Sequence, residues 1–126
     1  MKHKNQMLSQ YMKNLNRVAV DFDGTLTIDG VTLCKGAKKY IVKIHNLGVN
    51  LILWTCRCDD RYDYAKQKIK EWSLPIDFIE DYELDKPRKL HAIYTIDDRS
   101  VPGGKINWYR TYRYIKKEIK RIKECE

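Results

Sequence analysis

An apolar run ends in two acidic residues and a glycine at Arg17-Val18-Ala19-Val20-Asp21-Phe22-Asp23-Gly24-Thr25. Apolar runs that stop abruptly at polar residues are typical of buried parallel strands. The spacing of two places both carboxylates on one side of the extended chain and turns Phe22 toward the core. Gly24 permits a tight turn directly afterwards. The stretch therefore predicts a buried strand with two carboxylates at its carboxyl end.

Two later segments repeat this pattern. Residues 49–54 form an apolar run that leads into Thr55, and residues 92–96 lead into Asp97. Residues 76–79 are expected to add a short strand. Because open α/β sheets bind their ligands at the carboxyl ends of parallel strands, we expect the polar residues at these ends to converge.

Helical periodicity separates the predicted strands. Apolar residues recur at helical spacing over residues 37–47, a segment closed by Gly48. A second helix is expected to start with Asp59 or Asp60 as its N-cap and to run to about Trp72. The alternation of strands and helices predicts an α/β fold, a three-layer Rossmann-like arrangement with a mostly parallel sheet flanked by helices.

A final helix is expected after the glycine pair at residues 103 and 104. Its apolar residues follow a 4-3-4-3 spacing: Trp108, Tyr112, Ile115, Ile119 and Ile122. We expect this stripe to pack on the sheet. The alternative is a seam through which the C-terminal helix forms a homo-oligomer.

The length of 126 residues is typical of a single domain, with a core over about 17–110 and basic helical extensions at both ends. A hydrophobic fraction of 43% argues against intrinsic disorder. The first residues lack the apolar stretch of a signal peptide, and no run approaches the roughly 18 apolar residues of a membrane span. A cytoplasmic protein with no membrane partner is therefore expected.

The net charge of +8 is concentrated at the two ends of the chain. Residues 1–17 carry four Lys or Arg and no acids, whereas residues 105–126 carry eight against three acids. Residues 18–104 are near neutral, with thirteen against fourteen. Such ends could attract nucleic acid or another polyanion, although a solvated basic face is the simpler interpretation.

The four cysteines show no disulfide framework, which suits a reducing compartment. They are Cys34, Cys56, Cys58 and Cys125. Cys56-x-Cys58 together with His45 is an alternative set of metal ligands, set against the simpler interpretation of free thiols.

The carboxylates after the first strand suggest phosphate chemistry only if cations accompany them. An anionic nucleophile that approaches a phosphate dianion is repelled by roughly 4 kcal/mol per charge pair at about 4 Å and an effective dielectric near 20. Asp97 and Asp98 offer oxygen ligands of the kind that Mg²⁺ uses. Lys86 or Lys89 offers a fixed positive charge, and Thr55 offers a hydroxyl and a strand-end amide for phosphoryl oxygens.

Four motifs stand in order along residues 17 to about 110. They are Val18-Ala19-Val20-Asp21-Phe22-Asp23-Gly24-Thr25-Leu26-Thr27, Leu51-Ile52-Leu53-Trp54-Thr55, Arg88-Lys89 and Ile96-Asp97-Asp98-Arg99. With these motifs the sequence resembles the haloacid dehalogenase-like phosphatase superfamily. The resemblance implies a Mg²⁺-dependent phosphomonoesterase that acts through an aspartyl-phosphate intermediate.

The resemblance also implies roles for individual residues. Asp21 would be the nucleophile, and Asp23 would be the acid/base that protonates the leaving group and then activates water. Asp21, Asp23 through its backbone carbonyl, Asp97 and Asp98 would form the Mg²⁺ site.

The phosphoryl group would be held by Thr55, Lys89 and the turn at Gly24. Lys86 remains the alternative to Lys89, which is preferred because it directly precedes the segment that enters the acidic pair. Larger members of the superfamily insert a cap domain after the first or second strand. Residues 27–36 have room for only a short loop or hairpin here, so we expect an open site and a phosphorylated substrate that is either a small molecule or a macromolecule.

Other functions use parts of the same pattern. The chain could be a nucleic-acid-binding protein on a degenerate phosphatase fold, or a phosphatase of nucleotides or nucleic-acid ends. Phosphotransfer to an acceptor other than water would use the same residues. A receiver-type signalling domain has its acidic pair after the first strand and its phospho-accepting Asp after a later one, which is the opposite order.

Overall fold

The structure, a computed structural model, describes residues 17–78, 92, 94–98 and 104–124. Lys86, Arg88, Lys89 and Arg99 lie outside the described residues, as does the N-terminal basic extension. The elements in chain order are β1 (Arg17–Val20), α2 (Ala37–His45), β2 (Asn50–Leu53), α3 (Asp59–Glu71), β3 (Ile76–Asp77), β4 (Tyr94–Ile96) and α5 (Trp108–Glu124).

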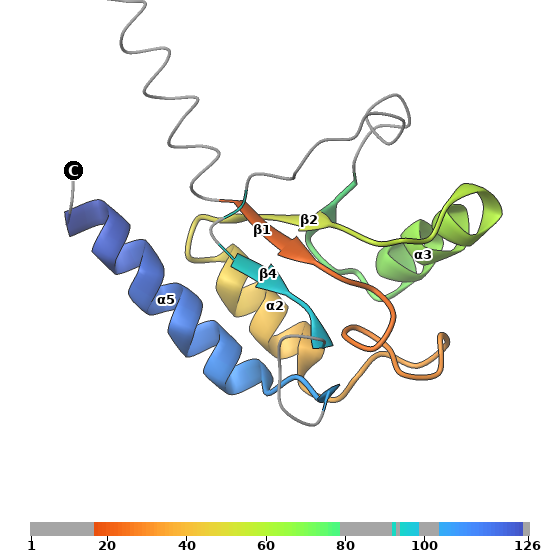
Figure 1. Cartoon of the computed structure of the whole chain (residues 1–126), viewed down its shortest axis with the longest axis horizontal. Coiled ribbons are helices and arrows are strands. Elements are labelled where there is room, and N and C mark those ends of the chain that lie inside the picture. The colour runs from red at the N-terminus through yellow and green to blue at the C-terminus, as the bar shows by residue number, and fades with distance from the viewer. Residues whose placement is uncertain (1–16, 79–91, 93, 99–103, 125–126) are drawn as a thin grey trace, which may run out of the picture.

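The four strands form one parallel sheet in the order β3-β2-β1-β4. Three helices flank it, with α5 packed beside α2 (Figure 1). This arrangement confirms the predicted α/β, Rossmann-like fold. Because β1 lies between β2 and β4 and all strands run in parallel, the carboxyl ends of these three strands meet at one edge of the sheet.

One face of the sheet carries the described core. Val18 and Val20 lie in register with Leu51 and Leu53 of β2, and Val20 also pairs with Ile96 of β4. Side chains two apart in a strand share a face, so these residues face the same layer. The helices contribute the buried residues Ala37, Ile41, Ile44, Tyr62, Ala65, Ile69, Trp108, Ile115 and Ile119 to the same cluster.

The described strands lie within the apolar runs that predict them. The run over 49–54 contributes Asn50–Leu53 to the sheet, and the run over 92–96 contributes Tyr94–Ile96. In the described residues β2 pairs with each residue of β1 from Arg17 to Val20, and β4 pairs with Val18–Val20; Ile93 lies outside the described residues. The short strand predicted at 76–79 is Ile76–Asp77, and its last predicted residue is not described.

The helix ends differ from the predicted ends by one or two residues. Helix α2 ends at His45 rather than residue 47, with Asn46 as its C-cap; Gly48 follows with a φ of 92°. Helix α3 has Cys58 as its N-cap, so the expectation of Asp59 or Asp60 is wrong. Both aspartates lie instead in the first turn, where their negative charge still favours the helix dipole.

Helix α5 packs its apolar stripe on the core, as expected. Trp108, Ile115 and Ile119 are buried, whereas Tyr112 and Ile122 are partly exposed. The buried residues of the stripe therefore pack within the same chain. Self-association through this helix stays a prediction that would have to use its remaining surface.

The segment between β1 and α2 contains no helix or strand, and each of its residues is described. It makes two isolated bridges, from Thr27 to Asp23 and to Leu33, and the Cys34 N–H donates to the Leu26 carbonyl at 2.7 Å. This is the short hairpin-like loop expected from its length. No helix within the described ranges is long and apolar enough to cross a membrane.

Candidate active site

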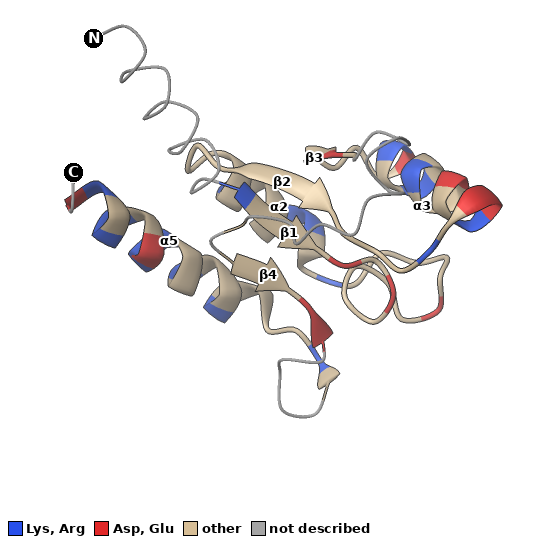
Figure 2. Cartoon of the chain, turned by 45° about the horizontal axis from the view of Figure 1, so that its top comes forward, with Lys and Arg blue, Asp and Glu red and all other residues tan. Residues whose placement is uncertain are grey.

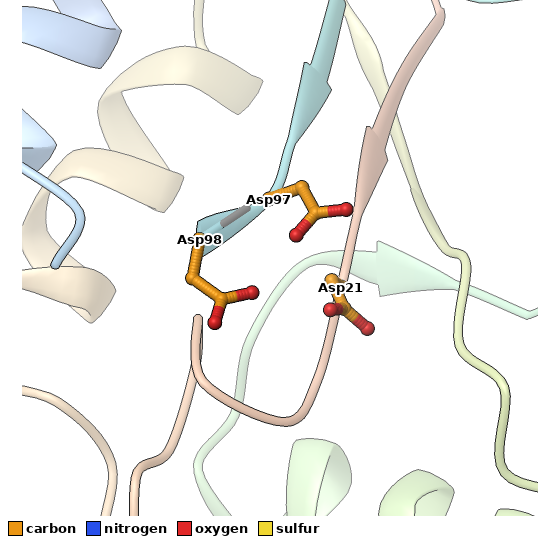
Figure 3. Close-up of side chains that lie close together, drawn as sticks. All are labelled: Asp21, Asp97 and Asp98. Atoms are coloured by element: carbon orange, nitrogen blue, oxygen red, sulfur yellow. The ribbon is translucent and has the colours of Figure 1, made fainter. Parts of the chain in front are cut away.

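Three carboxylates converge where β1 and β4 end. Asp21 directly follows β1, and Asp97 and Asp98 directly follow β4. One oxygen of each lies within 4.8 Å of one oxygen of each of the others. Figure 3 shows the three side chains directed toward the same space between the strand ends. The structure thus brings Asp21 together with an adjacent acidic pair, Asp97 and Asp98, that follows it by 76 and 77 positions in the sequence.

Backbone hydrogen bonds fix these strand ends relative to one another. The Asp21 N–H donates to the carbonyl of Ile96 at 3.0 Å. The Asp98 N–H donates to the hydroxyl of Thr25 at 3.2 Å, and Thr25 is buried. Two segments far apart in the chain are therefore connected on both sides of the carboxylates, which limits how far the acidic groups can separate to relieve their repulsion.

Burial and neighbouring charges raise the pKa of Asp21 from its ordinary value of 3.8 to about 6. Desolvation is the largest cause, and the carboxylates of Asp97, Asp98 and Asp23 add to it. A hydrogen bond from the Phe22 N–H to Oδ1 of Asp21, at 2.8 Å, partly opposes these effects. The site therefore favours either a proton or a cation near Asp21.

Replacing Asp21 by asparagine is expected to stabilise the cation-free protein at pH 7. The folded-state pKa is raised, so the stability contributed by this proton is complete below pH 3.8 and is lost as the pH rises through about 6. Asparagine avoids that loss. Asp21 is only half-buried, and after solvent screening is allowed for we expect a gain of about 1 kcal/mol. Thermal unfolding in EDTA at pH 7 and pH 4.5 measures it. An equal change in melting temperature at both pH values would contradict this assignment.

Gly24 occupies the turn between the first strand and the loop, with a φ of 78°. A Cβ built on Gly24 would lie 2.4 Å from Oδ2 of Asp98 and 2.8 Å from its Cγ. Two independent constraints therefore exclude a side chain: the left-handed backbone and the carboxylate that faces it. The Gly24 N–H donates to the Thr27 carbonyl at 2.8 Å, which closes the turn.

The substitution Gly24→Ala is expected to displace Asp98 from the carboxylate cluster. The backbone at position 24 also has a positive φ, which costs roughly 1 kcal/mol or more in a non-glycine residue. We expect a lower melting temperature and weaker binding of Mg²⁺, measured by titration calorimetry. Gly48→Ala is the matched control, because Gly48 also has a positive φ, of 92°, but nothing lies within 4 Å of its added Cβ. If the control weakened Mg²⁺ binding equally, the clash with Asp98 would not be the cause.

The carboxylate of Asp23 pairs with Arg57. Nε of Arg57 donates to Oδ2 of Asp23 and Nη2 donates to Oδ1, each at 2.8 Å, which is a bidentate ion pair. The hydrogen bonds from Arg57 hold the pKa of Asp23 below its ordinary value, and the charges of Arg57 and Arg61 contribute to the same shift. The carboxylate of Asp23 is not one of the three grouped acids.

Arg57 is the functional candidate that sequence reasoning missed. Its side chain is only 14% exposed, and its guanidinium carbon lies 4.8 Å from the ring centroid of Phe22 and 5.6 Å from that of Tyr64. Tyr64 in turn donates its hydroxyl to the Gly30 carbonyl at 2.7 Å. The signal in the sequence was an arginine two residues after Thr55, on the loop that follows a strand end.

Thr55 follows β2, one strand away from the acidic cluster. Its hydroxyl accepts a hydrogen bond from the Arg57 N–H at 3.2 Å. A hollow of about 340 Å³ at the strand ends is lined by Asp21, Asp23, Gly24, Thr55, Cys56 and Asp98. The structure therefore places Thr55 and Gly24 around the same space as three of the four predicted acidic residues, whereas Asp97 is not among the residues that line it. Lys89 and its alternative Lys86 are outside the described residues.

A larger hollow of about 800 Å³ adjoins this space at Gly24. Residues of the loop over 25–35 and of the segment that leads into α5 line it. The loop is held by Asp29, whose carboxylate accepts the N–H groups of Val31 and Thr32 at 2.8 and 2.7 Å. These bonds hold the pKa of Asp29 far below its ordinary value. The hollow at the carboxylates thus adjoins a larger hollow on the side of the loop.

The chemistry of the donor set fits Mg²⁺. Three carboxylate oxygens within reach of one another match the hard oxygen ligands that Mg²⁺ prefers, and they leave room for water. The alternative of Cys56, Cys58 and His45 gains no support, because the acidic cluster is the one such grouping found in the described ranges. Cys56 and Cys58 are exposed free thiols.

No known protein-family model matches the sequence, and neither does any curated protein. A solved structure of a conserved protein coded by a locus from Bacteroides thetaiotaomicron is similar, with a TM-score of 0.64 and 27% sequence identity. The match covers 82% of this chain and 92% of that one. The similarity extends over most of both chains and supports the fold described above.

Proposed function

We propose that the chain is a Mg²⁺-dependent phosphohydrolase that acts on phosphate monoesters through an aspartyl-phosphate intermediate. The observation that carries this proposal is the convergence of Asp21 with Asp97 and Asp98 at the ends of adjacent parallel strands. The order of motifs, which resembles that of the haloacid dehalogenase-like phosphatases, supports the same assignment. Thr55 lies on the rim of the same hollow, as a phosphate-binding residue would.

Asp21, Asp97 and Asp98 would hold Mg²⁺ by their carboxylates. Bound there, the cation would supply positive charge that favours ionised Asp21 and offsets the repulsion between its carboxylate and a phosphate ester. The Thr55 hydroxyl would donate a hydrogen bond to a phosphoryl oxygen, and Lys89 would add a positive charge.

The reaction divides into two steps. An oxygen of Asp21 attacks phosphorus, the bond from phosphorus to the ester oxygen breaks, and Asp23 transfers a proton to the departing alcohol. Water then attacks the aspartyl-phosphate and gives its proton to Asp23, so that inorganic phosphate leaves and both carboxyl groups return to their starting states. Atoms and protons balance over the cycle, with one water consumed for each ester.

In the free site the pKa of Asp21 is raised, although a nucleophile has to be ionised. The pKa of Asp23 is lowered, although a general acid has to be protonated. A bound phosphate changes the surroundings of Asp23: its negative charge raises the carboxyl pKa and also competes for Arg57. We therefore propose that Arg57 is a positioning residue. It holds the Asp23 carboxylate in one orientation until substrate enters.

The substitution Arg57→Met is expected to lower kcat/KM by about 10- to 100-fold, which is less than the roughly 100- to 10,000-fold that a general acid–base group itself contributes, because Asp23 is still present. Removing the guanidinium also raises the pKa of Asp23 in the free enzyme. In the plot of kcat/KM against pH, the change that reports ionisation of Asp23 should therefore move to higher pH. A purely structural role of Arg57 would not produce this shift. Arg61→Met is the control, because Arg61 is exposed and acts on Asp23 by charge alone. An unchanged profile in Arg57→Met would remove Arg57 from the mechanism.

Phosphate release from a generic aryl phosphate tests the proposal. The chain is expected to release phosphate when Mg²⁺ is present and to stop when EDTA is added. A panel of phosphorylated metabolites, nucleotides and 3′- or 5′-phosphorylated oligonucleotides then identifies the substrate class. Absence of turnover across the whole panel, with Mg²⁺ bound, would overturn the proposed activity.

A further inference from the structure

Helices α2 and α5 carry all of the excess positive charge among the described helices. Helix α2 has three lysines and no acid, and α5 has seven Lys or Arg against two Glu. Helix α3 is balanced, with four basic and four acidic residues. In Figure 2 the ribbon of α3 shows both colours, whereas α2 shows no red and α5 is mainly blue among its charged positions. Because α2 and α5 pack together, this excess charge lies on two neighbouring helices.

Tyrosine rings lie among these charges. The ring centroid of Tyr40 on α2 lies 6.0 Å from those of both Tyr109 and Tyr112 on α5. Nζ of Lys43 lies 5.5 Å from the Tyr40 centroid and 5.6 Å from that of Tyr112. Tyr109 is 50% exposed, so its ring is accessible. Tyrosine rings and a lysine cation from the two helices therefore lie next to one another.

We define the Tyr–Lys surface as this area of α2 and α5. Its residues are Lys39, Tyr40, Lys43, Tyr109, Tyr112, Arg113, Lys116, Lys117 and Lys120. A hollow of about 410 Å³ lies on its α5 side. Across the described part of the chain, no ion pair includes any of its basic residues.

We propose that the Tyr–Lys surface binds single-stranded nucleic acid. Its cations match the phosphate backbone, and the exposed ring of Tyr109 offers a face on which an unpaired base can stack, with the partly exposed rings of Tyr40 and Tyr112 beside it. A duplex buries its base faces, so the rings would add nothing to duplex binding. The proposal concerns a surface made by α2 and α5 and does not depend on catalysis at the carboxylate cluster.

Fluorescence anisotropy of the full chain with labelled oligo(dT) and oligo(U) tests the proposal, in EDTA so that turnover plays no part. We expect binding that weakens steeply with salt. The double change Lys43→Gln and Lys116→Gln should reduce the slope of log K against log salt by about 1.4, which corresponds to two lost phosphate contacts. The double change Lys66→Gln and Lys70→Gln on α3 removes the same charge elsewhere and should leave the slope unchanged.

The aromatic contribution is tested with a matched pair on the same helix. Tyr109 and Tyr114 are each 50% exposed, but Tyr114 packs against Tyr94, at 5.1 Å between centroids, and lies outside the Tyr–Lys surface. Tyr109→Leu should weaken single-strand binding at least roughly fivefold, as loss of one stacked base does. Tyr114→Leu should have little effect. Circular dichroism confirms that each variant is folded.

Several outcomes would overturn the proposal. One is the absence of binding at low salt. A second is an equal loss in the α3 control or in Tyr114→Leu, which would indicate general charge attraction. Duplex DNA that binds as tightly as the single strand would exclude base stacking. Polyglutamate or phosphatidylserine vesicles that compete as well as the oligonucleotide would assign the surface to an acidic protein or a membrane instead.

Discussion

Replacing Asp21 by asparagine should lower the rate of phosphate release by at least about a thousandfold, the scale on which removal of a nucleophile acts. The amide of asparagine keeps the shape of the side chain, but it lacks the carboxylate that attacks phosphorus. The measurement is Mg²⁺-dependent hydrolysis of an aryl phosphate, with substrate affinity obtained separately. Full retention of activity would exclude Asp21 as the nucleophile.

The effect of Asp21→Asn on stability serves as a control for folding. Since Asp21→Asn is expected to stabilise the cation-free protein, its loss of activity cannot be assigned to unfolding. Asp77→Asn is the matched surface control, because Asp77 is an exposed aspartate at the carboxyl end of another strand, β3. It removes one carboxylate from outside the cluster and should leave the rate unchanged.

Removing Mg²⁺ is the second change expected to have a large effect. EDTA should reduce hydrolysis to background, and Mg²⁺ should raise the melting temperature of the wild-type chain. At 100 times its Kd, a ligand that binds only the folded state adds about 2.7 kcal/mol of stability. For a domain of this size that corresponds to a rise of roughly 10 °C.

The double substitution Asp97→Asn and Asp98→Asn should abolish both responses to Mg²⁺. It removes two of the three grouped carboxylates and leaves Asp21 in place. The double substitution Asp59→Asn and Asp60→Asn is the matched control, because it changes an adjacent pair of exposed aspartates on α3 by the same charge. A rise in melting temperature that persists in the first variant would place the cation elsewhere.

The acidic part of the site could be predicted from sequence because its carboxylates come at or just after the end of an apolar run. Asp21 and Asp97 stand at the ends of the runs that became β1 and β4, and parallel pairing then brings them together. The position of Thr55 followed from the same reasoning. This prediction did not depend on the exact first and last residue of each strand, because parallel strands have their carboxyl ends at the same edge of the sheet.

Contacts between loops could not be predicted in this way. Arg57 and Asp23 are 34 residues apart, and their pairing depends on the path of two loops rather than on any local pattern. The closeness of Gly24 to Asp98 likewise appears only when the ends of β1 and β4 are side by side. Sequence reasoning assigned Gly24 to a tight turn but gave no reason why a methyl group would displace an acidic ligand.

Chemical trapping of the intermediate tests the central claim most directly. The chain is mixed with a phosphate monoester and Mg²⁺, quenched in acid and treated with borohydride, which reduces an acyl phosphate of aspartate to homoserine. Mass spectrometry of the tryptic peptide over residues 18–35 then locates the change. We predict homoserine at position 21 and unmodified aspartate at position 23. Rapid turnover with no reduction at position 21, or reduction at position 23 instead, would contradict nucleophilic attack by Asp21.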